Sequence, residues 1–183
     1  MQCCAGCGAS ADARQLYWLT AAKQVRLSPH EFFRKRCGHG DASLNLSIRE
    51  AVDADAGEIA ALRVAAANDL TERFGEGFWS SNTTDKGVLF GMKHGRVLVA
   101  TKAGAIVGTL NLSTRKPWAI DPAYFTRVKA PIYLTNMAVA PVAQGQGVGR
   151  AMLLAAEEAV RKWPGQAIRL DAFDADAGAG AFY

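Results

Sequence analysis

The sequence contains no long hydrophobic run, although half of its residues are hydrophobic. It has 183 residues and is 50% hydrophobic, but no window approaches the ~20 apolar residues that a helix needs to cross a bilayer. Residues 1–22 also lack the basic start and apolar block of a secretory signal peptide. We therefore expect a soluble, cytoplasmic protein with no membrane partner and with one main hydrophobic core.

A strong excess of charge of one sign is also missing. The chain has 21 Lys and Arg against 17 Asp and Glu, which gives a net charge of +4. This excess would help to attract a polyanionic ligand. It is too small and too dispersed to indicate nucleic acid as a partner, and no feature of the sequence indicates an oligomeric state.

Cysteine is absent after residue 37. The four cysteines are Cys3, Cys4, Cys7 and Cys37. Cys4, Cys7, Cys37 and His39 have the ligand types of a Cys₃His zinc site, although about 30 residues separate Cys7 from Cys37, which is wide for a zinc finger. The alternative is a reduced leader without a metal. Residues 1–43 are therefore predicted to form an appendage of uncertain structure, and no metal ligand is assigned.

The segment from Val139 to Arg150 is the most informative part of the sequence. It follows an apolar run from Ile132 to Val139 that predicts a strand, ended by Pro141, which cannot donate to a sheet ladder. From Val148 onward, apolar residues recur at three- and four-residue spacing, which predicts a helix with one buried face. The glycines between them therefore lie at a helix N-terminus, where free N–H groups and the helix dipole favour a phosphate.

Three nucleotide-binding motifs can be compared with this turn. A dinucleotide fingerprint, G-x-G-x-x-G, fails because counting from Gly145 puts Arg150 at the third glycine. A P-loop fails because no Lys-Ser or Lys-Thr pair follows the glycines. The pattern Gln144-x-x-Gly147-x-Gly149 resembles the Q/R-x-x-G-x-G/A pyrophosphate loop of the GNAT superfamily of N-acetyltransferases. An ordinary glycine-rich turn between a strand and a helix is the alternative interpretation.

The predicted order of elements agrees with that resemblance. In chain order these are a strand over residues 44–50, a helix over 56–69 capped by Asp53 or Asp55, a helix after Thr84, strands over 97–101, 106–112 and 132–139, a helix from 148, a strand over 167–173 and a helical start over 174–183. The order β-α-α-β-β-β-α-β-α predicts an α/β fold, a GNAT-like mixed β-sheet flanked by helices, in a domain that spans residues 44–183.

The resemblance also leads us to expect that this domain is truncated at its C-terminus. Asp176-x-x-Ala179-x-x-Phe182-Tyr183 resembles the start of the last GNAT motif, where Asn is more usual at the first position and a Gly-Phe pair follows. The chain stops at Tyr183, before that pair. We therefore expect the last strands to be missing, which would leave an open sheet edge.

The GNAT resemblance implies acetyl-CoA as the cosubstrate and a set of residues that bind it. The backbone of Met137, Ala138 and Val139, bulged and splayed from the next strand, would pair with the pantetheine arm. The turn and helix start would hold the pyrophosphate, and Asp176 would contribute from the last motif. The turn and helix residues are Gln144, Gly145, Gln146, Gly147, Val148, Gly149 and Arg150.

The implied reaction is acetyl transfer to a primary amine of a small molecule or peptide, by direct attack through a tetrahedral intermediate. Tyr183 matches the family's acid for the departing thiolate; a packed aromatic is its alternative role. The N–H of Met137 or Ala138 is the candidate for stabilising the oxyanion. No base is obvious, so we expect a water relayed by Asn136 or by a distant acid such as Asp171.

Two aromatic loops, residues 73–79 and 116–125, would flank the acceptor groove. With Glu76 and Asp121 they would suit a small cationic amine, although their aromatic side chains could instead close the core. A different class of function stays open beside the enzyme. It is a catalytically inactive module that binds CoA and serves in regulation or in contact with a partner.

Overall fold

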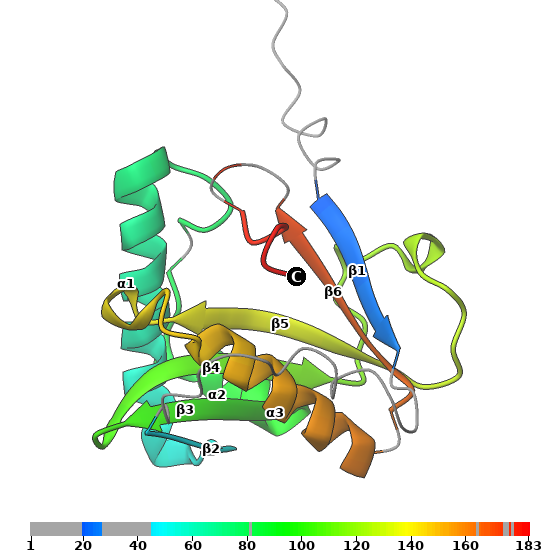
Figure 1. Cartoon of the computed structure of the whole chain (residues 1–183), viewed down its shortest axis with the longest axis horizontal. Coiled ribbons are helices and arrows are strands. Elements are labelled where there is room, and N and C mark those ends of the chain that lie inside the picture. The colour runs from blue at the N-terminus through cyan, green and yellow to red at the C-terminus, as the bar shows by residue number, and fades with distance from the viewer. Residues whose placement is uncertain (1–19, 27–44, 81, 164, 174–175, 177) are drawn as a thin grey trace, which may run out of the picture.

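The chain builds its fold around one mixed β-sheet (Figure 1). A computed structural model of the protein describes residues 20–26, 45–80, 82–163, 165–173, 176 and 178–183. In chain order the helices and strands are β1 Thr20–Arg26, β2 Leu46–Glu50, α1 Ala56–Phe74, α2 Asp85–His94, β3 Arg96–Lys102, β4 Ala105–Ser113, β5 Pro131–Val139, α3 Val148–Lys162 and β6 Ala167–Phe173. Single 3-10 turns precede α1, β5 and α3.

The described strands lie in the order β1-β6-β5-β4-β3-β2. Neighbouring strands run antiparallel, except that β5 and β6 run parallel. A parallel pair needs a crossover connection, and α3 supplies it. From β2 to β6 the elements follow the predicted order, so the prediction of a mixed α/β sheet flanked by helices is confirmed.

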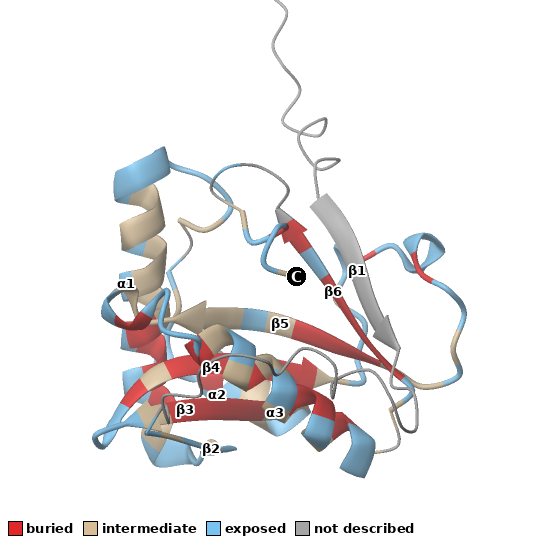
Figure 2. Ribbon diagram, viewed as in Figure 1, coloured by how far each residue is buried: buried red, intermediate tan, exposed pale blue. Residues whose placement is uncertain are grey.

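The two faces of the sheet pack against different helices, because successive strand residues point to opposite sides. On β3, Leu98 and Ala100 belong to the buried cluster that includes α3, whereas Val97 and Val99 belong to the cluster that includes α1 and α2. Figure 1 shows α3 in front of the sheet with α1 and α2 behind it, and Figure 2 shows buried residues concentrated in the central strands.

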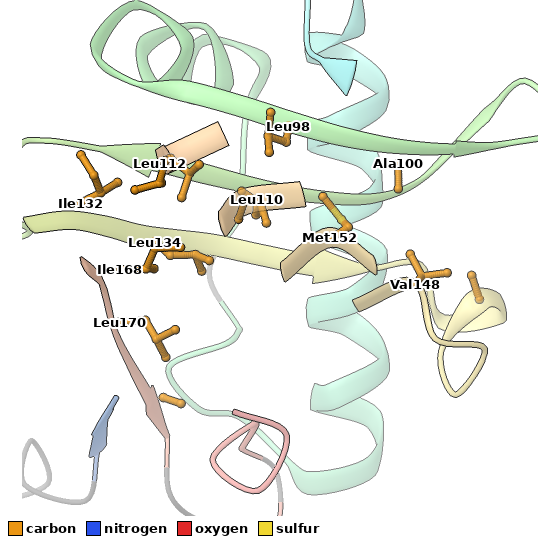
Figure 3. Packing of buried hydrophobic residues seen from close by; sticks show 14 residues of the cluster. Leu98, Ala100, Leu110, Leu112, Ile132, Leu134, Val148, Met152, Ile168 and Leu170 are labelled. Carbon is orange, nitrogen blue, oxygen red and sulfur yellow. The ribbon is translucent and has the colours of Figure 1, made fainter. Parts of the chain in front are cut away.

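The larger cluster fixes α3 on the sheet. Met152 and Val148 of α3 pack with Leu110 and Ala100 of the sheet (Figure 3), and Met152 and Leu110 are fully buried. Complete burial of such a side chain contributes about 1.5–3 kcal/mol. Gly108 on β4 makes room for this contact, because a Cβ atom there would lie 2.6 Å from the Met152 sulfur. The start of α3 is therefore held in a defined place beside β4.

An unpredicted strand, β1, covers the outer edge of β6. It pairs antiparallel from Thr20 opposite Phe173 to Arg26 opposite Ala167. Its sequence, Thr-Ala-Ala-Lys-Gln-Val-Arg, has few β-branched residues and no clear alternation, so its strand pattern is weak. The edge beside β6 is thus occupied by β1, where an open edge was expected. The domain boundary at residue 44 stays a prediction.

The zinc interpretation falls on Cys4, Cys7, Cys37 and His39, all of which lie outside the described residues. Within the described part of the chain, no group of three His, Cys, Asp or Glu side chains could hold a metal ion.

The helical start predicted over residues 174–183 is wrong for the described part of that segment. Residues 176 and 178–182 form turns and bends. The N–H groups of Phe182 and Tyr183 donate to the carbonyl of Ala179 at 3.0 and 3.3 Å. Gly178 and Gly180 explain the difference, because glycine is a poor helix former and a short helix is costly to nucleate.

The helix ends partly follow their predicted caps. At α2, the Thr84 hydroxyl accepts the N–H of Gly87 at 3.3 Å, as an N-cap residue does. Asp55 lies at the N-cap position of α1, but its carboxylate accepts the N–H of Val52, which precedes the helix. Helix α1 runs beyond the predicted end and stops at Gly75, whose φ is +79°. None of the described helices is long and apolar enough to span a bilayer.

Candidate active site

Strand β5 contains a bulge in its second half. Asn111 of β4 pairs with Thr135, and Thr109 pairs with Ala138, so β5 has one more residue than β4 between these points. Within this stretch Asn136 has a φ of +53°, a left-handed conformation that Asn tolerates better than most residues. A bulge bends its strand and interrupts the hydrogen-bond ladder. The predicted bulge is therefore present.

Strands β5 and β6 separate just beyond their start. Their parallel pairing is confined to Pro131–Tyr133 on β5, and Figure 1 shows the strands diverging, with the C-terminal segment between them. A groove of about 400 Å³ opens in this region, which is in the size range of ligand pockets. Its lining residues are Met137, Ala138, Val139, Ala143, Gln144, Gly145, Gly147, Val148, Gly149, Arg150, Ala179, Phe182 and Tyr183.

The start of α3 forms one wall of this groove. Gly145 and Gly147 have φ angles of +72° and +83°, which glycine adopts without strain, and Gly147 is the N-cap residue. A Cβ atom on Gly149 would lie 3.0 Å from the ring of Phe182, so a larger residue at this position would crowd that ring and narrow the groove. The first N–H groups of α3 have no partner within the helix, and together they can bind an anion.

The two glutamines of the turn make structural hydrogen bonds. The Gln144 amide donates to the carbonyl of Val139 at 3.3 Å, and the Gln146 amide donates to the carbonyl of Val142 at 2.8 Å. Lys102, at the end of β3, donates to the Gln146 side chain at 2.9 Å. These bonds tie the turn to the end of β5 and bring a cation beside it. Sequence analysis missed Lys102 because only the tertiary fold brings it to the turn.

Tyr183 closes the groove against the bulge. Its hydroxyl donates to the sulfur of Met137 at 3.3 Å, and its ring meets the ring of Phe182 edge-on at 5.1 Å. Burial raises the pKa of the Tyr183 phenol to about 12 because it disfavours the charged form. The phenol therefore stays protonated at neutral pH, as a proton donor must.

A second pocket of about 340 Å³ lies on the other side of the bulge. Its lining residues are Arg63, Ala66, Ala67, Leu70, Phe78, Trp79, Thr83, Asn136, Met137, Ala138, Val139 and Gln144. The residues shared with the groove are Met137, Ala138, Val139 and Gln144. The two cavities therefore meet at β5, one on the side of Tyr183 and the other on the side of α1.

Only one of the two predicted aromatic loops lines the second pocket. Phe78 and Trp79 of residues 73–79 are among its lining residues. In the other loop, Phe125 is buried with Ile120 and Tyr133 and so closes a small core cluster, and Trp118 is 81% exposed. Glu76 and Asp121, which suggested a cationic acceptor, line neither cavity.

Most predicted site residues meet in these two cavities. Gln146 and Asp176 do not line either one; Gln146 is held by the turn, and Asp176 is exposed. Asp171 is likewise exposed, on β6. Ala143, Ala179 and Phe182 line the groove although sequence analysis did not single them out as ligand contacts. Phe182 carried a signal, because it belongs to the same terminal motif as Tyr183.

Comparisons with known proteins agree with this geometry. Residues 64–183 match the sequence model described as the acetyltransferase (GNAT) family. The chain belongs to the GNAT acetyltransferase family. The match covers the bulged strand, the turn, α3 and the C-terminal segment, which are the elements that build the GNAT groove in this chain. No curated protein sequence matched the chain.

Solved GNAT structures share the fold at low sequence identity. A GNAT family acetyltransferase from Brucella melitensis, in complex with acetyl-CoA, is 20% identical over 69% of this chain and 75% of its own, with a TM-score of 0.52. An aminoglycoside acetyltransferase from an uncultured soil metagenomic sample is 18% identical over 75% and 86%, with a TM-score of 0.53. The PaiA N-acetyltransferase from Thermoplasma acidophilum, in complex with coenzyme A, is 12% identical over 64% and 72%, with a TM-score of 0.50.

Proposed function

We propose that this protein transfers the acetyl group of acetyl-CoA to a primary amine of a small molecule or peptide. The observation that carries the proposal is the groove itself. A glycine-lined helix start and a bulged strand end form its two walls, and the protonated hydroxyl of Tyr183 lies against the bulge at Met137. The groove thus has an anion-binding part and a proton donor.

The residues present fit acetyl-CoA. The N–H groups at the start of α3, with Gly147 and Gly149 leaving the backbone open, would hold the diphosphate. Arg150 at the same place adds a positive charge. Met137 to Val139 lie beyond the short segment in which β5 pairs with β6, and they would pair with the amides of the pantetheine arm. A stretched ligand of this kind suits an open groove about 400 Å³ in volume better than an enclosed cavity.

Acetyl-CoA supplies a thioester, whose carbonyl carbon accepts an amine while the bond from carbon to sulfur breaks. The N–H of Met137 would stabilise the negative oxygen that develops, and one such donor lowers a barrier by roughly 3–4 kcal/mol. The Tyr183 hydroxyl would donate its proton to the departing sulfur. The amine gives up one proton as the new carbon–nitrogen bond forms, so proton loss and gain balance.

A base must also remove a proton before the attack, since a lysine-like amine has a pKa near ~10.4 and is protonated at neutral pH. No Asp or Glu is among the described residues that line either cavity. Asn136, exposed at the bulge and lining the second pocket, would position a water that passes the proton to solvent. Asp171 is exposed on β6 and lines neither cavity, so the relay through it is dropped.

Calorimetric titration of acetyl-CoA into the full chain tests the groove. Gly149→Val should weaken binding, because its side chain would crowd Phe182 and occupy part of the groove. Gly57→Ala is the matched control. Gly57 lies on α1, away from the groove, and a Cβ atom there would lie at ordinary contact distance, 3.7 Å, from an oxygen of Asp85. Equal binding by wild type and Gly149→Val would contradict the assignment. Release of free thiol in the presence of an amine panel then tests turnover; binding without any release would overturn the transferase.

A further inference from the structure

Arg63 of α1 lines the second pocket, and no described residue forms an ion pair with it. Its side chain is half-buried, and its Nε atom is buried with no hydrogen-bond partner. The guanidinium donates one weak hydrogen bond to a described residue, from Nη2 to the hydroxyl of Thr109 at 3.5 Å. Burial lowers the pKa of Arg63 to about 10, because it disfavours the charged form.

Two other arginines of the chain donate short hydrogen bonds and so differ from Arg63. Arg169 is more deeply buried, yet it donates to the carbonyl of Thr126 at 2.8 Å and lies over the ring of Phe125 at 5.0 Å. Arg49 makes two short bonds to the carboxylate of Asp55, at 2.6 and 2.8 Å. Arg63 forms no ion pair in the described part of the chain, and a buried charge without a partner is costly.

Arg63 lies close to the proposed reacting centre at the bulge of β5. Its contact Thr109 pairs across the sheet with Ala138, and Ala138 lines both cavities. The guanidinium therefore lies near the point where groove and pocket meet. The rest of the pocket is apolar or neutral, with Leu70 and Trp79 among its walls and no acidic residue among the described lining residues.

We propose that the acceptor amine carries a carboxylate, which Arg63 binds so that the amine faces the acetyl group. This inference rests on the proposed function. A guanidinium presents a fork of donors that fits a carboxylate, and the apolar walls suit an apolar body, so the acceptor is of the amino-acid type. The small cationic amine suggested by Glu76 and Asp121 does not fit, because Arg63 would repel a second cation in this pocket.

The test compares each acceptor that has a carboxylate with its primary amide, in which that negative charge is absent. Phenylalanine, leucine and glycine, each as free acid and as primary amide, are assayed for thiol release with the full chain. The free acids should have a kcat/KM higher than their amides by roughly 10- to 100-fold, the range expected for hydrogen bonds to a charged group. Arg63→Met should remove this preference, so that the ratio of kcat/KM between each free acid and its amide falls toward one. Arg63→Lys should restore part of it.

Two controls separate this proposal from the enzyme assignment and from a structural role. Arg161 pairs with Glu157 of the same helix, α3, on the face of the sheet opposite to α1. Arg161→Met should therefore keep the preference for the free acid over the amide. Calorimetric binding of N-acetylphenylalanine and its amide, in the presence of CoA, reports on Arg63 without turnover. A difference between acid and amide that Arg63→Met removes would support the proposal even if no amine reacts. Equal behaviour of acid and amide, including no binding by either, would overturn it.

Discussion

The hydroxyl of Tyr183 lies 3.3 Å from the sulfur of Met137, which joins the C-terminal segment to the bulge of β5. These residues are 46 positions apart in the chain, and only the fold brings them together. The thioether is a weak hydrogen-bond acceptor, so the phenol is held in place without being strongly engaged. It is therefore free to donate to a better acceptor, such as a departing thiolate.

Tyr183→Phe should lower kcat by roughly 10²-fold or more, the usual contribution of a positioned acid. The ring and its contact with Phe182 remain, so acetyl-CoA affinity should change little. Steady-state kinetics beside calorimetry measures both quantities. An unchanged kcat would show that Tyr183 is only a packed aromatic.

The raised pKa of Tyr183 also predicts a loss of stability in alkali. Its folded-state pKa of about 12 lies above the ordinary value near ~10, so its contribution is complete below pH ~10 and is lost as the pH rises toward 12. The loss should be on the order of 2–3 kcal/mol. Urea unfolding between pH 9 and 12 should show a steeper decline for wild type than for Tyr183→Phe. Parallel curves would contradict this prediction.

Two substitutions at Asn136 separate its conformation from its chemistry. Asn136→Gly keeps the left-handed backbone at φ +53°, so acetyl-CoA binding should be retained while kcat falls by roughly 10²-fold if the side chain positions a water. Asn136→Val should destabilise the fold by about 1–2 kcal/mol, because a β-branched residue is strained there. Thermal unfolding and kinetics give the two readouts. Full activity in Asn136→Gly would remove Asn136 from the mechanism.

Gly108→Ala should weaken cosubstrate binding from outside the groove. The new methyl would lie 2.6 Å from the sulfur of Met152 and 3.0 Å from a methyl carbon of Val148, so α3 must move away from β4. Overpacking of this kind costs about 1–3 kcal/mol, and Val148 is the first residue of α3. Thermal unfolding and acetyl-CoA titration should both shift, whereas in Gly57→Ala neither should.

Acid stability should depend on Asp55. The Arg49 guanidinium beside it lowers the pKa of the Asp55 carboxyl to about 2, so its contribution is present above the unfolded value near ~4 and is lost as the pH falls from 4 toward 2. Solvent screens this surface pair, so the effect should be about 1 kcal/mol. Unfolding of Asp55→Asn at pH 7 and pH 2 measures it, with Asp53→Asn as the charge-matched control. Equal losses in both variants would contradict the role of the pair.

Sequence analysis captured the elements with strong local signals. Three local signals predicted a strand, a turn and a helix, and the structure has all three. They were the apolar run from Ile132 to Val139, the stop at Pro141 and the apolar spacing after Val148. The cap at Thr84 was likewise readable, because a side-chain hydroxyl before a helix acts over three residues. Such signals lie within a few positions of one another.

The parts that were missed depend on partners far away in the chain. Strand β1 has a weak pattern and is defined only by its pairing with β6. The unpaired state of Arg63 is invisible in a sequence, where it resembles any other arginine on a helix. The expected helix after β6 failed for a local reason, since Gly178 and Gly180 favour turns. The motif that carried Tyr183 was informative about residue type and not about helix content.

The pairing of β1 with β6 sets an order for folding. Each contact in this pair joins residues between 141 and 153 positions apart, from Arg26 with Ala167 to Thr20 with Phe173. Closing so long a loop is entropically unfavourable, and contacts of high sequence separation form slowly. During synthesis β1 is made before β2 to β6. Its complete pairing with β6 is possible only after residue 173 has been made. We therefore expect the β1 edge of the sheet to form after β2 to β5 have already packed into a core.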